Sequence, residues 1–214
     1  KTDKLSPVSD QLGCKAHWAV SAVETLESAI AIKKNGTAAD TRISVQHLID
    51  CDSTNVGCVG GWPARAWKFF QKIGYVAPEA YPYKQYLGAK RQCLAIKDKT
   101  TIKKLDSEFR GRQYVTLKVD QLKQLVQIQP VSVAVNAPPC FRLYKRGVIS
   151  HYDCPCTSAS FDEVEVNEII TVVGFGQTKQ TDKEYTYCSG YWIARPSFGA
   201  TWGENGYVRM CIPR

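Results

Sequence analysis

Nine cysteines in 214 residues are the feature that most limits how this chain can fold. They are widely and irregularly spaced, at positions 14, 51, 58, 93, 140, 154, 156, 188 and 211. Paired zinc knuckles need a regular short spacing, and only Cys154-Pro155-Cys156 is a close pair. Disulfides formed in an oxidising compartment are the better interpretation. Because the count is odd, at least one thiol is left free or bonded to another chain.

Length and composition indicate one large globular domain or two subdomains around a shared cleft. Of the residues, 44% are hydrophobic and 22% are charged. No apolar run approaches the roughly 18–20 residues of a membrane span, so we expect no spanning segment. The first residues contain no signal-like apolar stretch, which favours a processed form.

The chain is basic, with a net charge of +8. Its densest basic stretch covers residues 97–104. No aromatic-basic platform or zinc-finger spacing accompanies this stretch, so a solvated basic face is favoured over a nucleic-acid or heparin surface. We expect a monomer with no nucleic-acid partner.

The first half of the chain has helical patterns and the second half has strand patterns. Helices are expected at 17–34, after Ser44 as a cap, at 62–74 and at 119–128; strands are expected at 131–135, 169–175 and 191–194. This distribution predicts the α+β class, with a helical lobe at 1–104 and a β-rich lobe at 105–214.

Several separated segments carry a specific resemblance. They are Asp10-Gln11-Leu12-Gly13-Cys14, residues 43–51, Gly57-Cys58-Val59-Gly60-Gly61, Tyr81-Pro82-Tyr83, residues 129–133 and Trp202-Gly203-Glu204-Asn205-Gly206-Tyr207. In this order they resemble the papain-like family of cysteine proteases, which includes cathepsin L and the group 1 mite allergens. The resemblance covers almost the whole chain. It implies a two-lobe papain-like fold, with a helical lobe, an antiparallel barrel-like lobe and a cleft between them.

The positions that carry catalysis in this family are replaced. His17, in Cys14-Lys15-Ala16-His17-Trp18, stands where the family has its nucleophilic cysteine. Glu168 stands at the position of the general base, and Pro196 at that of the asparagine that orients it. The oxyanion-hole glutamine is retained as Gln11. The resemblance therefore implies a protein with no catalytic residue, a pseudoprotease.

The chemistry of the replacements supports this interpretation. Catalysis of this type needs a thiolate, an imidazole that shares its proton, and an amide that fixes the imidazole. His17 offers a weak nucleophile, and Pro196 has neither a side-chain amide nor a backbone N–H. We expect His17 and Glu168 to face each other, joined by a hydrogen bond or an ion pair.

A metal site is the alternative interpretation of His17 and Glu168. A third and a fourth zinc ligand are hard to identify, because His47 belongs to another helix and His151 and Cys156 lie in a separate loop. His47 is expected to be an ordinary packed or surface histidine. We expect no metal and no cofactor.

The resemblance also assigns a substrate cleft. Its residues are Gly60, Gly61, Trp62, Pro63, Ala134 and Asn167. The second glycine needs only its main chain to pair with an extended peptide, so it could still bind one by strand addition. The alternative, that both glycines merely permit the turn at Cys58, stays open.

Disulfide pairs are implied by the resemblance as well: Cys14–Cys58, Cys51–Cys93, and a third bridge in which Cys154 or Cys156 pairs with Cys188 or Cys211. The last assignment is open. Cys140 is expected in a structural disulfide or as the odd thiol, and a displaced nucleophile is the alternative. Asn35-Gly36-Thr37 fits the glycosylation sequon.

Two functional hypotheses follow from the sequence. The first is an inactive paralogue in a secreted, extracellular or lysosome-like oxidising location, acting by binding a protein or peptide, for example as a decoy or in host interaction. Inactive relatives of the group 1 mite allergens are one plausible source. The second is a residual or altered hydrolase that uses His17 or Cys140.

Overall fold

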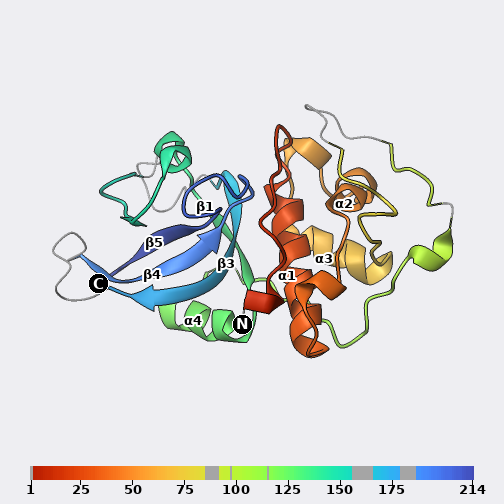
Figure 1. Ribbon diagram of the computed structural model, residues 1–214, viewed down its shortest axis with the longest axis horizontal. Coiled ribbons are helices and arrows are strands. Elements are labelled where there is room, and N and C mark those ends of the chain that lie inside the picture. Colours follow the sequence, from red (N-terminus) through yellow and green to blue (C-terminus); the bar gives the residue numbers. More distant parts are fainter. Residues whose placement is uncertain (1, 85–91, 97, 115, 156–165, 179–186) are drawn as a thin grey trace. The chain divides into compact units, whose positions relative to one another are not determined.

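Two compact units make up the protein in the computed structural model, which describes residues 2–84, 92–96, 98–114, 116–155, 166–178 and 187–214 (Figure 1). The first unit contains Lys1–Pro7 and Gln11–Thr116, and the second contains Val8–Asp10 and Leu117–Arg214. The division lies beyond the expected boundary at residue 104. Residues after 104 still pack on the first unit: Phe109 is buried, and a Cβ on Gly111 would lie 2.9 Å from the Trp67 ring.

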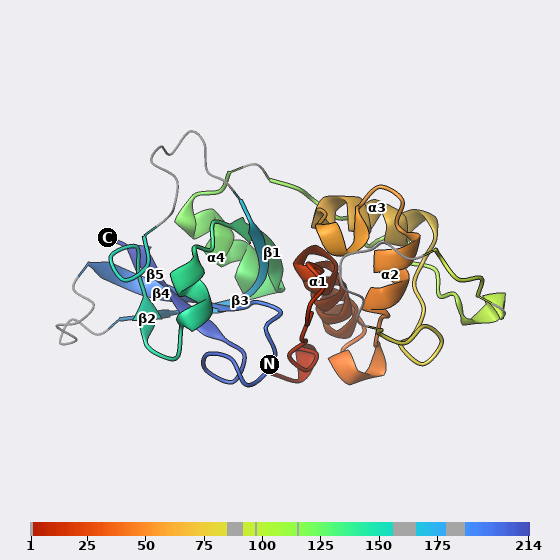
Figure 2. The same ribbon diagram turned by 90° about the horizontal axis from the view of Figure 1, so that it is seen from above.

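The first unit is helical. Its α-helices are α1 (His17–Lys33), α2 (Val45–Cys51) and α3 (Pro63–Lys72), and its 3-10 helices are η1 (Thr2–Lys4), η2 (Ala38–Asp40), η3 (Gly57–Val59) and η4 (Lys99–Thr101). In both views α2 and α3 lie beside α1 (Figures 1 and 2). Fourteen consecutive residues of α1, from Trp18 to Ala31, are buried, so this helix is the core of its unit. The three α-helices agree with the sequence prediction.

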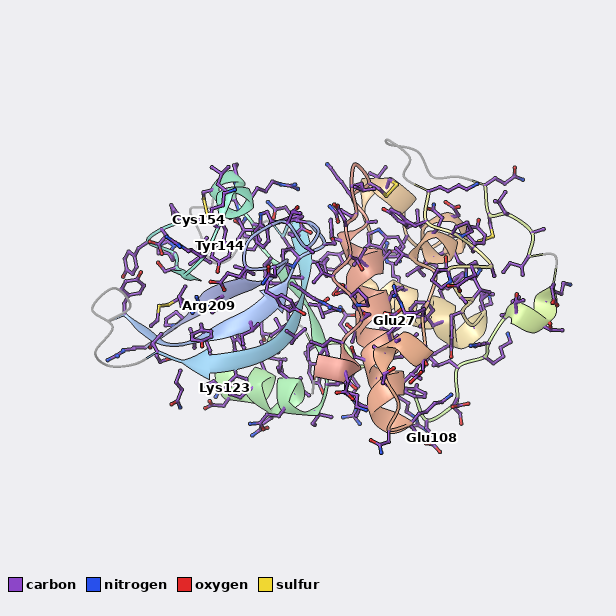
Figure 3. All side chains as sticks on the ribbon, viewed as in Figure 1. Glu27, Glu108, Lys123, Tyr144, Cys154 and Arg209 are labelled. Carbon is purple, nitrogen blue, oxygen red and sulfur yellow. A yellow bond between two sulfur atoms is a disulfide. The ribbon has the colours of Figure 1, made fainter. Side chains whose placement is uncertain are left out.

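The buried Glu27 carboxyl of α1 has hydrogen-bond partners. Glu27, labelled in Figure 3, accepts a hydrogen bond from the Ile43 N–H (2.8 Å) and one from the Arg42 Nε (3.3 Å). Burial raises the pKa of the Glu27 carboxyl above its ordinary value. Glu27 therefore anchors the segment that leads into α2.

The second unit is a sheet with one α-helix against it. Its elements are α4 (Val119–Ile128), β1 (Val131–Val135), η5 (Pro139–Leu143), β2 (Val148–Ile149), β3 (Glu168–Gln177), β4 (Cys188–Arg195) and β5 (Val208–Pro213). The strand order is β1-β3-β4-β5-β2. Three pairings are antiparallel, but β2 pairs with β5 in parallel. Figure 1 shows α4 against the sheet, and Val126 and Leu122 of this helix pack with Val172 of β3 in one core.

The loop between β4 and β5 is fastened to its own unit. Glu204 binds Arg209 through two hydrogen bonds, Nε to Oε2 at 2.9 Å and Nη2 to Oε1 at 2.6 Å. Its Oε1 also accepts from the Gly147 N–H. The Tyr144 hydroxyl donates to the Gly147 carbonyl, close to Arg209 (Figure 3). The segment with the strongest family likeness thus has a structural role here.

Four disulfides join eight of the cysteines. Cys14–Cys58 and Cys51–Cys93 form as implied by the resemblance. The expected bridge from Cys154 to Cys188 or Cys211 is wrong, because the remaining pairs are Cys140–Cys154 and Cys188–Cys211. Cys156 lies outside the described residues.

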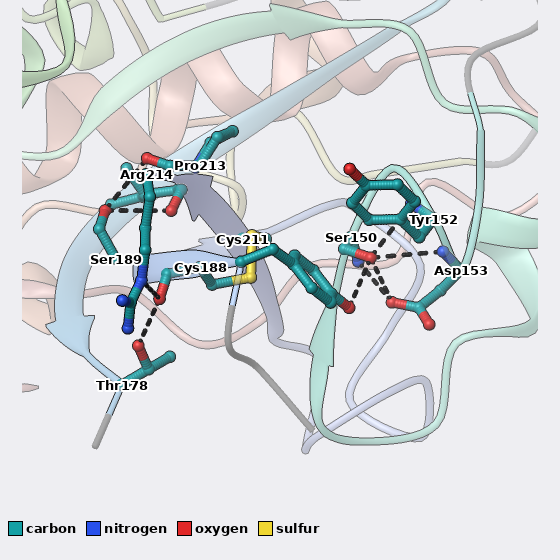
Figure 4. The surroundings of a disulfide bond; sticks show 11 residues. Ser150, Tyr152, Asp153, Thr178, Cys188, Ser189, Cys211, Pro213 and Arg214 are labelled. Atoms are coloured by element: carbon teal, nitrogen blue, oxygen red, sulfur yellow. Dashed lines mark hydrogen bonds between the residues drawn. A yellow bond between two sulfur atoms is a disulfide. The ribbon is translucent and has the colours of Figure 1, made fainter. Parts of the chain in front are cut away.

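The corrected pairs follow from the local structure. Cys188 and Cys211 lie on the adjacent antiparallel strands β4 and β5, which brings their side chains within bonding distance (Figure 4). The other bridge closes a short loop, since its cysteines are 14 residues apart. Four disulfides fit an oxidising compartment. Among the described residues no helix is long and apolar enough to cross a bilayer.

Candidate functional site

His17 is the first residue of α1 and is half-buried. The preceding turn is fixed by the Cys14–Cys58 disulfide and by the Lys15 N–H, which donates to the Cys58 carbonyl at 3.1 Å. Ala16 caps the helix without a side-chain hydrogen bond, and the first turn contains no acidic residue. The imidazole therefore lies at the positive end of the helix dipole, where a neutral ring is better tolerated than a cation.

Gln11 lies six residues before His17, the first residue of this helix. It is 5% exposed, and its carbonyl accepts hydrogen bonds from the Tyr83 hydroxyl (2.8 Å) and the Cys14 N–H (3.2 Å). The next residue, Leu12, has a φ of 55°, so the chain reverses sharply there. The main chain around Gln11 is thus well fixed.

The glycine segment of the expected cleft is positioned by Asn55. The buried Asn55 amide accepts from the Trp62 N–H (2.7 Å) and donates to Asp52 Oδ2 (2.7 Å). Gly61 packs so closely that a Cβ there would lie 2.5 Å from Asn55 Oδ1 and 2.7 Å from the Trp18 ring. Only glycine fits this position, for a packing reason.

The two glycines of this segment differ in how their main chains are used, because the Gly60 carbonyl accepts a hydrogen bond from the Val56 N–H at 3.0 Å. Gly60 has a φ of 144°, and a Cβ added there would meet nothing within 4 Å. Within the described residues, the N–H and C=O of Gly61 make no hydrogen bond. Trp62 is 45% exposed, and Pro63 begins α3.

Glu168, the first residue of β3, is 3% exposed. Its burial raises the pKa of the carboxyl to about 7, although Arg142 opposes the shift. The Arg142 Nη2 lies 4.0 Å from Glu168 Oε2, and the Arg142 side chain is 65% exposed. Desolvation outweighs this partly solvated cation, so the neutral acid is favoured below about pH 7.

Asn167 has a structural role. Its amide bonds both main-chain groups of Ala137: Oδ1 accepts from the N–H (2.7 Å) and Nδ2 donates to the C=O (3.2 Å). The side chain is therefore occupied by the loop after β1. Ala134, opposite Ile169 in the β1–β3 register, is exposed.

Pro196 is buried directly after β4. Two residues later, Phe198 forms an isolated bridge with Asp10, and the Arg142 guanidinium lies 4.7 Å from its ring centre. The Trp202 indole N–H donates to the Arg142 carbonyl at 2.9 Å. This aromatic packing holds Arg142 near Glu168.

The expected site residues therefore form two groups, one in each unit. Gln11, His17, Gly60, Gly61, Trp62 and Pro63 belong to the first unit, and Ala134, Asn167, Glu168 and Pro196 to the second. The expected contact between His17 and Glu168 joins residues of different units and stays a prediction.

Sequence reasoning missed Asn55 and Arg142. Asn55 lies five residues before Gly60, and no motif marks it. Arg142 is 26 residues from Glu168, so the pair depends on tertiary structure. The one signal in the sequence for Asn55 was that Asn is a turn-forming residue and precedes a glycine pair. The sequence contained no signal for Arg142.

The proposal that Cys140 is a displaced nucleophile is wrong, because its sulfur is bonded to Cys154. His47 is a packed histidine, 3% exposed, whose ring lies 5.3 Å from that of Phe69. Asn35 is exposed at the end of α1, which is compatible with a sequon but does not test its modification. Among the described residues, no three His, Cys, Asp or Glu side chains are grouped as a metal site needs.

Comparisons with known proteins agree on one family. The family model described as papain family cysteine protease matches residues 1–213. The oryzain gamma chain of Oryza sativa subsp. japonica is 33% identical over 211 residues, which are 96% of this chain and 52% of that protein. The chain thus spans about half the length of the curated relatives it matches.

Solved structures give the same result. Bromelain from Ananas comosus, in complex with the E64 inhibitor, has a TM-score of 0.71 at 30% identity and covers 97% of this chain and 85% of its own. The proform of the ragweed pollen allergen Amb a 11 has a TM-score of 0.76 at 30% identity, covering 98% and 57%. The chain belongs to the papain family of cysteine proteases.

Proposed function

We propose that this domain is a proteolytically inactive member of the papain family that acts by binding an extended peptide or protein segment in an oxidising, extracellular or lysosome-like location. The observation that carries the proposal is His17 at the start of α1, where the family motif has its nucleophilic cysteine. The nearest cysteine in the sequence, Cys14, is in a disulfide with Cys58. No thiol at this helix start is left to attack a peptide bond.

The other replaced positions support inactivity. Glu168 at the base position favours its neutral form up to about pH 7, and a neutral carboxyl accepts protons poorly. Pro196 supplies no amide to orient a base. Loss of the nucleophile alone lowers turnover about a million-fold in a serine protease with comparable triad logic, so three replacements leave no efficient route.

Binding is supported by the glycine segment. Packing against Trp18 and Asn55 fixes the Gly61 main chain, while its N–H and C=O have no partner in the described part of the chain. An extended peptide could satisfy both groups, as an added strand does. Val59 (62% exposed) and Trp62 (45% exposed) flank the segment with apolar surface.

Hydrolysis of fluorogenic dipeptide substrates, with and without an irreversible thiol-directed inhibitor, tests inactivity. We expect no turnover above that of the His17→Ala variant. The triple variant His17→Cys, Glu168→His, Pro196→Asn restores the family's residues and should gain inhibitor-sensitive turnover. Inhibitor-sensitive turnover by the unmodified protein would contradict the proposal.

Peptide binding is tested separately by NMR titration with an acetylated leucine tripeptide amide. The Gly61 amide signal should shift on binding, and a form of the same tripeptide in which every N–H, including those of the terminal amide, is methylated should bind more weakly because it lacks donors. Equal affinities for the two peptides would show that strand addition at Gly61 does not occur.

A further inference from the structure

A cavity of about 390 Å³ opens beside α2 in the first unit. Its lining includes Asp50 and Gln46 of α2, Tyr81, and the apolar side chains Leu94 and Ile96. None of the residues that carry the proposed peptide binding, and none of the replaced catalytic positions, line it. Its volume lies within the range of small-molecule sites.

The polar side of the cavity is rigidly organised. Asp50 Oδ1 accepts a hydrogen bond from Gln46 Nε2 (2.9 Å), and Oδ2 accepts one from the Tyr81 hydroxyl (3.0 Å). The Leu94 N–H donates to the same hydroxyl at 3.0 Å. The Cys51–Cys93 disulfide fixes the residues next to Asp50 and Leu94. The wall that carries the carboxylate is thus preformed.

The charge on this wall has no counter-ion within the described chain. Asp50 is 3% exposed, its two hydrogen-bond donors are neutral, and no described Lys, Arg or His forms an ion pair with it. Buried carboxylates are normally paired, because desolvating an isolated charge is costly. A cationic ligand in the cavity would supply the missing charge.

The charged residues at the rim, Asp98 and Lys84, are of opposite sign and are both exposed. Asp98 also lines the cavity, and hydrogen bonds from the side chain and N–H of Thr100 lower the pKa of its carboxyl. Lys84 lines it too, but this residue is exposed. Water screens both exposed charges far more than it screens the buried carboxylate of Asp50, so Asp50 decides the sign of the ligand.

We propose that this cavity binds a primary alkylammonium group. The ammonium would donate hydrogen bonds to Asp50, and the aliphatic chain would pack on Leu94 and Ile96. The same chemistry is offered by a small free amine and by the side chain of a lysine in a peptide. The site is independent of the peptide-binding segment at Gly61.

A matched ligand series tests the proposal on the unmodified protein. n-Hexylammonium, 1-hexanol and hexanoate have similar chains but carry positive, zero and negative charge at pH 7. We expect n-hexylammonium to bind at least about tenfold more tightly than the other two, because hydrogen bonds to a charged group exceed neutral ones by that order. The amide NMR signals of Leu94 and Ile96 should shift.

Other outcomes overturn the proposal: equal affinity for n-hexylammonium and 1-hexanol, tighter binding of hexanoate, shifts confined to other parts of the chain, or no binding. The peptide acetyl-Gly-Lys-Gly-amide separates the two sources. If it binds as n-hexylammonium does, the ligand is a lysine side chain; if only n-hexylammonium binds, it is a small amine.

Variants locate the charge that selects the ligand. Asp50→Asn should abolish the preference for n-hexylammonium, whereas Asp106→Asn removes the same charge outside the cavity and should preserve it. Asp98→Asn, at an exposed position, should weaken n-hexylammonium binding severalfold without unfolding. If Asp50→Asn does not fold, the ligand series on the unmodified protein and the Asp98→Asn variant still test whether the cavity prefers a cation. No peptidase or tripeptide assay is involved, so failure here leaves the proposed function untouched.

Discussion

At the scale of the residue, Glu168 of the second unit has a carboxyl whose pKa is raised by burial. Its carboxyl is almost completely buried, and the Arg142 side chain, whose Nη2 lies 4.0 Å away, is mostly exposed. Burial therefore raises the pKa of Glu168 from 4.5 to about 7. The folded protein holds this proton more tightly than the unfolded chain does.

Replacing Glu168 by Gln should change the pH dependence of stability. Because the folded pKa is raised, the stability contributed by Glu168 is fully present below pH 4.5 and is lost as the pH rises to about 7. We expect Glu168→Gln to abolish this decline and to raise the free energy of unfolding at pH 8 by about 1–3 kcal/mol. Urea unfolding between pH 4 and 8 measures it.

A variant of Arg142 tests the pKa of Glu168 directly. Arg142→Met removes the charge that lowers the pKa of Glu168, so the carboxyl should titrate at a higher pH, as followed by its 13C NMR signal. The prediction is contradicted if the pKa of Glu168 is near 4.5 in the unmodified protein and is the same in Arg142→Met, and if Glu168→Gln leaves the pH dependence of unfolding unchanged. These results would show that the carboxyl is effectively solvated.

The identities of the residues at the expected catalytic positions were readable from the sequence, but their surroundings were not. His17, Glu168 and Pro196 were located by motif order. Arg142 near Glu168 and Asn55 behind Gly61 depend on chain segments that meet only after folding, so no local pattern could reveal them. Asn167, assigned to the cleft, proved to have its amide bound by Ala137.

At the scale of the element, α2 is a short helix that depends on its cap. Ser44 Oγ accepts from the His47 N–H at 3.0 Å and donates to the Tyr81 carbonyl at 2.5 Å. Seven residues are too few for a helix to persist by propensity alone, so cap and packing hold it. The same helix carries Asp50 and Gln46 of the cavity.

Ser44→Ala should lower the free energy of unfolding by about 2 kcal/mol. About half of this is the lost cap, and the rest is the lost hydrogen bond from Ser44 Oγ to the Tyr81 carbonyl. Chemical denaturation measures the change. Ser53→Ala, at an exposed position, is the matched control and should have little effect. Equal stability of both variants would show that α2 does not need the cap.

Periodicity predicted the long elements well. The bounds of α1, α4 and β1 agree with the sequence to within a residue, because each has a sustained apolar pattern and an identifiable start or stop. Strands β2 and β5 were missed. The first has two residues, too few to show a period, and the second contains Arg209 and ends at Pro213, which obscures its alternation.

At the scale of the whole molecule, the two units carry opposite pH responses. His47 in the first unit is buried, which lowers the pKa of its imidazole to about 4. The unfolded chain takes up a proton near pH 6.5, so stability from neutral His47 is lost as the pH falls from 6.5 to about 4. Over much of the same range Glu168 adds stability as the pH falls.

Native-state hydrogen exchange should resolve these responses. From pH 6.5 to 4.5, after correction for intrinsic exchange rates, we expect the free energy of opening to fall for amides of α2 and to rise for amides of β3. His47→Leu should abolish only the fall for amides of α2, and Glu168→Gln should abolish only the rise for amides of β3. The exposed His151→Gln variant should alter neither. Changes of the same sign in both units would contradict this assignment.

The sequence by itself determined the family, the α+β class, two of the disulfides and the residue types at the expected catalytic positions, because these depend on residue identity and motif order along the chain. Tertiary structure decided the Cys140–Cys154 and Cys188–Cys211 pairs, the raised pKa of Glu168, the partners of Asn55 and Asn167, and the cavity at Asp50. Each of these depends on distance and burial between residues far apart in sequence, and only the packed chain sets those quantities.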